Sequence, residues 1–211
     1  MSRVRVHNFT ISLDGYGAGP FQTREDPLGV GGETLHEWFI PTRAFQRING
    51  KSGGATGVDD DIAARFGQGV GAWIMGRNMF GPIRGPWPDD AWRGWWGKNP
   101  PYHGPVFVLT HHDRQPIEME GGTVFNFVDS FDAAFAAATK EAGDRPIDVA
   151  GGASAVRQAL QAGCLNELVL DIIPVVLGSG ERLFDNVSEL KAEPIEVATS
   201  PLATHIVYGI N

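Results

Sequence analysis

The sequence predicts an α/β fold with a mixed, mainly parallel sheet and helices on both of its faces. Short apolar segments that end in glycine or polar residues alternate with amphipathic helical patterns, which is typical of parallel β-α-β units. Near the end, the strand-like segments 194–200 and 204–210 flank Ser200-Pro201-Leu202-Ala203 and predict an antiparallel hairpin. No segment resembles a linker, so residues 1–211 are expected to form one domain.

The predicted elements follow in order along the chain. Strands are expected at 4–13, with a change of phase near Asn8, and at 72–75, 106–110, 123–128, 147–150 and 167–173. Helices are expected after Asp59, which with Asp60 and Asp61 offers N-caps, and also from 131 and over 153–162. Residues 16–58 read as a Gly-rich irregular segment that is either functional or contains a short helix at an unassigned position, because it is long for a loop. Residues 82–105 read as a Trp-rich loop.

Composition and charge exclude several classes of protein. The chain is 42% hydrophobic and 20% charged, which does not fit a disordered protein. Its net charge of −8 argues against broad binding to nucleic acid or to an anionic membrane. The single cysteine, Cys164, excludes an internal disulfide and a cysteine-based zinc site. No apolar run is long enough to span a membrane and no signal peptide is evident, so a cytoplasmic location is expected.

The most informative motif is the junction at Gly151-Gly152, where a buried strand stops and a helix starts at once. Glycine lets a ligand approach the backbone, and the free N–H groups of the first helical turn favour an anion. A pyrophosphate suits this place, although a tight turn with no ligand is the plain alternative.

Two further junctions can hold an anion. Gly76-Arg77-Asn78 follows the strand 72–75 and adds an arginine, a bidentate phosphate donor. The strand 106–110 ends in Thr110, and His111, His112 and Arg114 follow. Open α/β sheets bind ligands at the carboxyl ends of their strands, so three such junctions predict a long polyphosphate cofactor.

Six segments, in this order, resemble the dihydrofolate reductase superfamily and, within it, the reductase domain of riboflavin biosynthesis. They are ISLDG (11–15), DDDIAARF (59–66), IMGRNMFG (74–81), VFVLTHH (106–112), VAGGASAVRQAL (149–160) and PVVLGSGERLF (174–184). The resemblance implies a dihydrofolate-reductase-like three-layer α/β/α sandwich and a reductase that uses NADPH.

The resemblance also implies roles for particular residues. The pyrophosphate would lie between two groups, Gly76, Arg77 and Asn78 on one side and Gly151, Gly152, Ala153 and Ser154 on the other. Thr110, His111, His112 and Arg114 would hold the adenosine 2′-phosphate. Leu13, Asp14 and Gly15 would lie over the nicotinamide. The substrate stays open, because NMFGPI stands where the riboflavin reductase has ADDP and no dihydrofolate-type W-x-L-P motif precedes Asp59.

Three carboxylates are catalytic candidates. Asp14 lies in the loop expected over the nicotinamide, and Asp60 or Asp61 takes the place of the acid that positions dihydrofolate. Burial and like-charged neighbours would raise the pKa of such an acid. Turn formation by Asp14 and helix capping by the triplet are the structural alternatives. No metal site is expected, because consecutive carboxylates at a helix start diverge.

Tryptophans are the candidates for the substrate pocket. Trp95 and Trp96 belong to the Trp-rich loop, which reads either as a lid over a flat substrate or as a homodimer contact. Trp38 would form the opposite wall, near the possible acid–base residue His36.

The function expected from these residues is hydride transfer from NADPH to a C=N or C=O bond of a small heterocyclic molecule. Two rivals remain: a nucleotide-binding protein without turnover, and a hydrolase built on Asp59 to Asp61 and His36.

Overall fold

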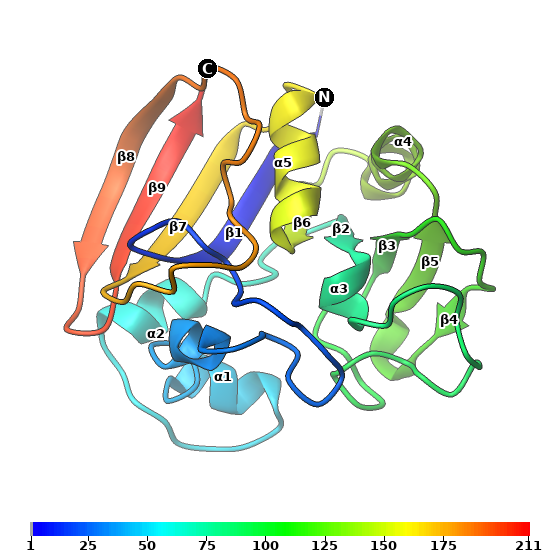
Figure 1. Ribbon diagram of the computed structural model, residues 1–211, viewed down its shortest axis with the longest axis horizontal. Helices are drawn as coiled ribbons and strands as arrows, with labels where there is room; N and C mark the ends of the chain where they lie inside the picture. The colour runs from blue at the N-terminus through cyan, green and yellow to red at the C-terminus, as the bar shows by residue number, and fades with distance from the viewer. Residues whose placement is uncertain (1) are drawn as a thin grey trace.

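The computed structural model describes residues 2–211, and Figure 1 shows strands and helices alternating along most of this length. The elements in chain order are β1 (Val4–Ser12), the 3-10 helix η1 (Gly32–His36), α1 (Arg43–Ile48), α2 (Val58–Ala63), β2 (Ala72–Gly76), α3 (Arg77–Phe80), β3 (Pro105–Leu109), β4 (Ile117–Glu118), the 3-10 helix η2 (Glu120–Gly122), β5 (Val124–Val128), α4 (Phe131–Ala142), β6 (Ile147–Gly151), α5 (Ala153–Gln161), β7 (Glu167–Ile173), β8 (Ala192–Thr199) and β9 (Thr204–Ile210).

The strands form one nine-stranded sheet in the order β4-β5-β3-β2-β6-β1-β7-β9-β8. All the pairings from β5 to β7 across the middle of the sheet are parallel. The pairs β7–β9, β8–β9 and β4–β5 are antiparallel. The predicted mixed, mainly parallel sheet and its C-terminal hairpin are therefore confirmed.

Alternating side chains of β2 show why both faces of the sheet are covered. Ala72 and Ile74 join a core cluster with α4 and α5, whereas Trp73 and Met75 point to the opposite face and pack with Phe80. Successive strand residues face opposite sides, so an entirely apolar strand needs a layer on each.

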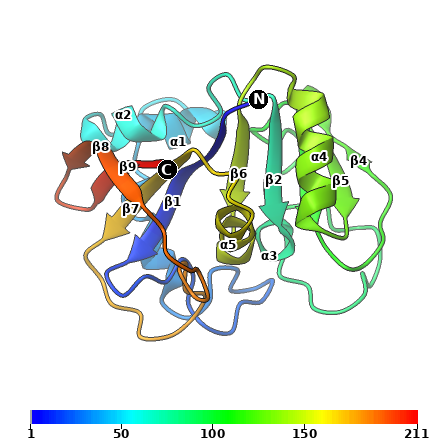
Figure 2. The same cartoon turned by 90° about the horizontal axis from the view of Figure 1, so that it is seen from above.

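The second layer on that opposite face comes from two different parts of the chain. Trp-rich residues of 82–105 cover β2, β3 and β5, and η1, α1 and α2 cover the β7 side with Leu35, Trp38 and Ile62. Figure 2 shows α5 and the α1–α2 pair on opposite sides of the sheet. The three-layer, dihydrofolate-reductase-like architecture is confirmed.

Strand β1 contains the predicted change of phase. Its register against β7 shifts between Val6 and Phe9, and Asn8 has a φ of 56°. This β-bulge moves Phe9 and Ile11 onto the face of the sheet that carries α5. Asn8 therefore has no register partner in β7, and it lies outside the regular pairing of the two strands.

The expectations for α2 and for the Gly-rich segment were confirmed only in part. Helix α2 has Gly57 as its N-cap without a side-chain bond, so Asp59, Asp60 and Asp61 lie inside its first turn rather than at its cap. The Gly-rich segment contains two short helices, η1 and α1, with Thr42 capping α1, which agrees with the alternative of a short helix in this segment. Their apolar positions are too few for a periodic pattern, and packing against the sheet supplies their stability.

Other local expectations held. Ser130 caps α4 by accepting a hydrogen bond from the backbone N–H of Ala133, as predicted. Among residues 2–211, no helix is long and apolar enough to cross a membrane. The parallel strands all stop at the same edge of the sheet, so the glycine-rich junctions after β2 and β6 come together there.

Candidate functional site

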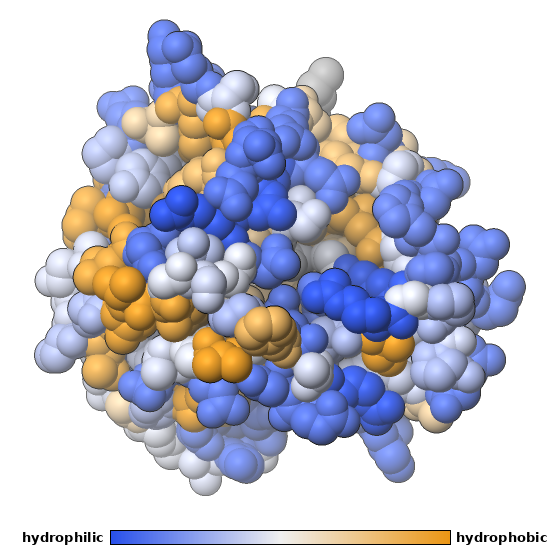
Figure 3. Space-filling view, in the orientation of Figure 1, coloured by the Kyte–Doolittle hydropathy of each residue, from blue (hydrophilic) through white to orange (hydrophobic). Residues whose placement is uncertain are grey.

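A cavity of about 950 Å³ opens where β2 and β6 end. Met75 and Gly151 are register partners across these strands, which places the junction at Gly76 against the junction at Gly151-Gly152. Figure 3 shows the surface hollowed between α5 and α3, with hydrophilic side chains beside the hollow. The volume is at the upper end for a small-molecule site.

The two glycines after β6 serve different purposes. Gly151 has a φ of +131°, and a Cβ there would lie 3.3 Å from the Met79 sulfur. Gly152 has an ordinary φ, and a Cβ there would meet no atom within 4 Å. Gly151 therefore permits the backbone path, whereas Gly152 leaves open space beside the start of α5.

Helix α5 starts at that open space. Gly152 is its N-cap, and Ala153 and Ser154, which line the cavity, are its first two residues. Backbone N–H groups in a first turn have no acceptor within the helix, and the helix dipole adds positive potential. The start of α5 therefore favours an anion in the open space beside Gly152.

Arg77 gives the opposite wall a positive charge without a partner. Its Nη1 lies 3.4 Å from Thr110 Oγ1, but its Nε and Nη2 are buried and have no hydrogen-bond partner among residues 2–211. Burial lowers the pKa of its guanidinium, and the charges of Arg114 and Arg84 lower it further. A bound anion would supply both the missing acceptors and the missing negative charge.

The residues expected to hold a 2′-phosphate divide into two groups. Thr110, His111 and His112 line the cavity beside Arg77. Arg114 lies outside the lining and donates to the backbone carbonyls of Asp90 and Trp92 at 3.1 and 2.6 Å. Its side chain is only 2% exposed, so it contributes charge from behind the site rather than contact.

Leu13, Asp14 and Gly15, directly after β1, lie outside the cavity lining. The Asp14 carboxylate accepts hydrogen bonds from Ser12 Oγ at 2.6 Å and from the backbone N–H groups of Leu177 and Gly178 at 3.1 and 2.7 Å. The bond from Ser12 does most to lower the pKa of Asp14 to about 2. Leu13 is 62% exposed, and neither it nor Gly15 lines the cavity.

Asp60 and Asp61 are likewise not among the lining residues. Asp60 is 3% exposed, accepts a hydrogen bond from the Ala44 N–H at 2.7 Å and pairs with Arg43 at 3.1 Å. Asp61 is exposed on the surface of α2. The contacts of Asp60 join α2 to α1, and His36 lies at the cavity without any carboxylate of the triplet beside it in the lining.

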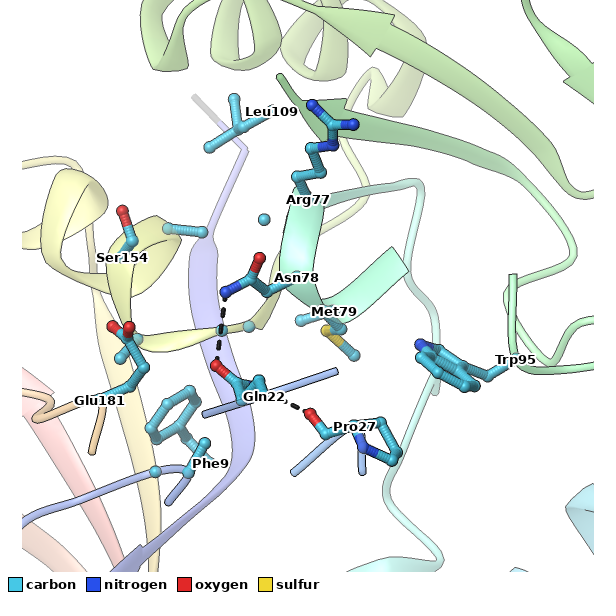
Figure 4. Close-up of a pocket in the computed structure, with 18 of the residues that line it drawn as sticks. Phe9, Gln22, Pro27, Arg77, Asn78, Met79, Trp95, Leu109, Ser154 and Glu181 are labelled. Carbon is cyan, nitrogen blue, oxygen red and sulfur yellow. Dashed lines mark hydrogen bonds between the residues drawn. The ribbon is translucent and has the colours of Figure 1, made fainter. Parts of the chain in front are cut away.

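All three predicted tryptophans line the cavity, in different ways. Trp38 is 2% exposed and donates to Thr10 Oγ1 at 3.1 Å. Trp96 belongs to the core and stacks on Phe125 with centroids 5.9 Å apart. Trp95 packs edge-on against Trp92 at 4.5 Å and faces the space in Figure 4.

The structure adds Phe9, Gln22, Met79 and Glu181 to the lining residues that the sequence predicts. Figure 4 shows Ser154, Glu181 and Phe9 on one side of the cavity, Arg77, Asn78 and Met79 on the other, and Gln22 between them. Gln22 Oε1 accepts from Asn78 Nδ2 at 3.4 Å, and Gln22 Nε2 donates to the Pro27 carbonyl at 2.9 Å. Gln22 thus connects the Gly-rich segment to α3.

Acid–base groups in the lining are few. Among the lining residues that the structure describes, the carboxylates are Glu181, whose side chain is 42% exposed, and Asp129. Burial first, and then Arg5 and Arg65, lower the pKa of His7 to about 4, and burial lowers the pKa of His36. Both imidazoles are therefore neutral near pH 7. Glu181 lies in the segment 174–184, one of the six segments that resemble the family. This resemblance is the sequence feature from which Glu181 could have been selected as a site residue.

Comparison with solved structures shows the same fold in other proteins. A Shewanella sp. PV-4 protein described as a riboflavin biosynthesis protein is 21% identical, with 100% of this chain and 99% of that one covered and a TM-score of 0.61. A pyrimidine reductase-like protein of Corynebacterium diphtheriae is 15% identical, with 100% and 92% covered and a TM-score of 0.57. The riboflavin biosynthesis reductase Rib7 of Saccharomyces cerevisiae is 14% identical, with 100% and 90% covered and a TM-score of 0.51.

A comparison with curated proteins found no match. The model of the family described as the RibD C-terminal domain matches residues 4–206, from the first strand of the sheet to its last. The match includes both glycine junctions and the cavity between them. The chain therefore belongs to the RibD C-terminal domain family.

Proposed function

We propose that this protein is an NADPH-dependent reductase that transfers a hydride to a C=N or C=O bond of a small heterocyclic substrate. The observations that carry the proposal are the open space at Gly152 beside the start of α5, and the guanidinium of Arg77, whose Nε and Nη2 have no hydrogen-bond partner among residues 2–211. Membership of the RibD C-terminal domain family and the likeness to proteins described as reductases support it.

The cofactor would be held by groups on both sides of the cavity. The backbone of Gly152, Ala153 and Ser154 would bind the pyrophosphate from one side, and Gly76 and Asn78 from the other. Arg77, with Thr110, His111 and His112, would bind the 2′-phosphate. When bound, the nicotinamide supplies the hydride.

The rest of the chain would prepare the substrate. Phe9, Trp38 and Trp95 form apolar walls that exclude water and suit a flat molecule. Glu181 and Asp129 are the lining carboxylates that can hold a proton. Since His7 and His36 are neutral near pH 7, they would act as hydrogen-bonding groups rather than as acids. The predicted homodimer remains a prediction.

The test combines binding with turnover. NADPH at a hundred times its Kd should stabilise the fold by about 2.7 kcal/mol, a rise in Tm of roughly 5–10 °C for a chain of this size. NADPH absorbance should also fall in the presence of a substrate from a panel that includes 5-amino-6-(5-phosphoribosylamino)uracil and dihydrofolate. No shift with NADPH or NADP⁺ would contradict the proposal, and binding without turnover on a broad carbonyl and imine panel would favour a non-catalytic nucleotide-binding protein.

A further inference from the structure

Three side chains far apart in the sequence, Asp59, Asp171 and His205, form a hydrogen-bonded chain, of which Asp171 and His205 are buried. His205 Nδ1 lies 2.6 Å from Asp171 Oδ1, and His205 Nε2 lies 2.9 Å from Asp59 Oδ1. Asp171 and His205 are directly opposed across β7 and β9, and Asp59 comes from the first turn of α2. Asp171 is 0% exposed and His205 is 1% exposed.

The two carboxylates decide how the imidazole is protonated. Each ring nitrogen of His205 faces a carboxylate oxygen, so both nitrogens carry a proton when both carboxylates are ionised. Burial acts to lower the pKa of His205, but the hydrogen bonds to Asp171 and Asp59 outweigh it and raise the pKa. Trp38 lies against the ring with centroids 4.9 Å apart and separates it from the cavity.

The chain continues to a residue that lines the cavity. Asp171 Oδ2 is 3.3 Å from Asn8 Nδ2, so an ionised Asp171 accepts a hydrogen bond from the amide group of Asn8. This bond sets the orientation of the amide. Asn8 Oδ1 is consequently turned away from Asp171, and it is buried without a hydrogen-bond partner in the part of the chain that the structure describes. The bulge in β1 and the φ of 56° at Asn8 hold the residue in this position.

We infer that Asn8 is a specificity-determining residue that offers its carbonyl oxygen to an N–H or O–H donor of the substrate. Asp171, His205 and Asp59 are positioning residues that keep the Asn8 amide in that orientation. A buried carbonyl oxygen without a donor is unfavourable, and a ligand with a matching donor removes this penalty whereas a ligand without one does not. The inference rests on the proposed function for one point only, namely that the ligand contacting Asn8 in the cavity is the substrate to be reduced.

Uracil and 1,3-dimethyluracil are suitable probes, because they are planar, neutral and share two carbonyl groups, but only uracil has N–H donors. Their Kd values would be measured by ligand-observed NMR, with and without NADP⁺. The wild-type protein should bind uracil at least about fivefold more tightly than the dimethyl compound, as expected for one hydrogen bond. Equal binding, or no binding of uracil, would overturn the inference.

Asn8→Gly tests the acceptor itself. Glycine accommodates the positive φ of this position, so the variant removes the amide without backbone strain. The preference for uracil should disappear in the variant while the NADP⁺ Kd stays within about twofold. A preference that persists in Asn8→Gly would show that another group recognises the donor.

Asp59→Asn and Asp171→Asn test the positioning chain. Both should reduce the preference for uracil, and Asp59→Asn should also lower the pKa of His205 measured by NMR of the ¹⁵N-labelled ring. Asp132→Asn is the matched control, because Asp132 is an exposed aspartate in the first turn of α4. A lowered His205 pKa with an unchanged preference would show a purely structural role for the chain.

The two proposals fail in different ways. A donor preference that depends on Asn8, without any NADP⁺ or NADPH binding, would overturn the proposed reductase and leave this inference standing. Binding of NADP⁺ or NADPH without any preference for uracil over 1,3-dimethyluracil would overturn this inference and leave the proposed reductase standing.

Discussion

The guanidinium carbon of Arg77 lies 3.9 Å from the centroid of the Trp87 ring. The guanidinium of Arg114 also lies over this ring, at 4.8 Å, and Trp87 Nε1 donates to the His112 carbonyl at 3.1 Å. Trp87 therefore holds Arg77 by the flat face of the guanidinium, and the N–H groups at Nε and Nη2 have no acceptor among residues 2–211. A carboxylate in that place would have neutralised the charge.

Arg77→Gln should reduce the discrimination between NADPH and NADH. Charge-assisted bonds are worth about 1.5–3 kcal/mol each, so the NADPH Kd should rise at least about tenfold while the NADH Kd changes little. Titration calorimetry or thermal shift measures both values. Arg145→Gln is the control, because Arg145 is exposed and outside the cavity lining. A parallel loss of NADH binding would place Arg77 at the pyrophosphate instead of the 2′-phosphate.

Gly152→Val should weaken NADPH binding by at least about tenfold, because the branched side chain enters the open space at the start of α5. The φ of −67° allows a side chain, so Tm without ligand should change little. Gly104→Val is the control: a Cβ there also has no contact closer than 3.8 Å, and Gly104 does not line the cavity. Unchanged NADPH affinity in Gly152→Val would mean that the cofactor binds elsewhere.

Trp95→Ala and Trp96→Ala should behave differently. Trp96 packs with Phe125 and Tyr102 in the core, so its removal should cost about 2–3 kcal/mol of unfolding free energy in a urea titration. Trp95 contacts Trp92 at the cavity, so Trp95→Ala should unfold near the wild-type midpoint and affect substrate KM. If Trp95→Ala instead turned a dimer into a monomer on gel filtration, the Trp-rich segment would be an interface.

His7 should make stability depend on pH. Its folded pKa is about 4 against an ordinary 6.5, so the unfolded chain takes up a proton that the folded protein does not. The unfolding free energy should therefore decrease as pH falls from 6.5 towards 4, and the full decrease should be about 3 kcal/mol.

Asp148 should change the unfolding free energy in the opposite direction to His7 over part of the same pH range. Burial raises the pKa of Asp148 from 3.8 to about 6, although the hydrogen bond from Arg5 opposes this shift. The contribution of Asp148 to the unfolding free energy should therefore fall as pH rises from 3.8 to 6. The difference between wild type and His7→Phe in urea titrations at pH 5 and 7.5 isolates the histidine. An equal pH dependence in both proteins would contradict the neutral, buried His7.

Local patterns were sufficient for much of the fold. The strand-to-helix junctions at Gly76 and Gly151 could be recognised because glycine, apolar runs and helix starts are local features of the chain. The phase change at Asn8 was also visible, since two alternating patterns meet there. Helix α1 could not be found in this way, because its six residues are stabilised by contacts with α2 and the sheet.

The candidate site was predictable to a lesser degree. Thirteen of the predicted site residues line the cavity: Gly76, Arg77, Asn78, Thr110, His111, His112, Gly151, Gly152, Ala153, Ser154, Trp38, Trp95 and Trp96. Asp14, Asp60 and Asp61 instead have hydrogen-bonding or surface positions outside the lining, and their catalytic roles stay predictions. A carboxylate at a turn and one at an active site look alike in a sequence, because only their partners distinguish them.

The sequence by itself determined the α/β class, the order of the strands and helices along the chain, and the glycine junctions with their arginine, because these follow from local periodicity and backbone freedom. Only the tertiary structure decided which side chains meet. Asp59, Asp171 and His205 share no motif, and they join beneath Asn8 because the β7–β9 register pairs Asp171 with His205 while α2 packs across them. Such contacts depend on strand register and layer packing, which long-range burial selects after the local elements have formed.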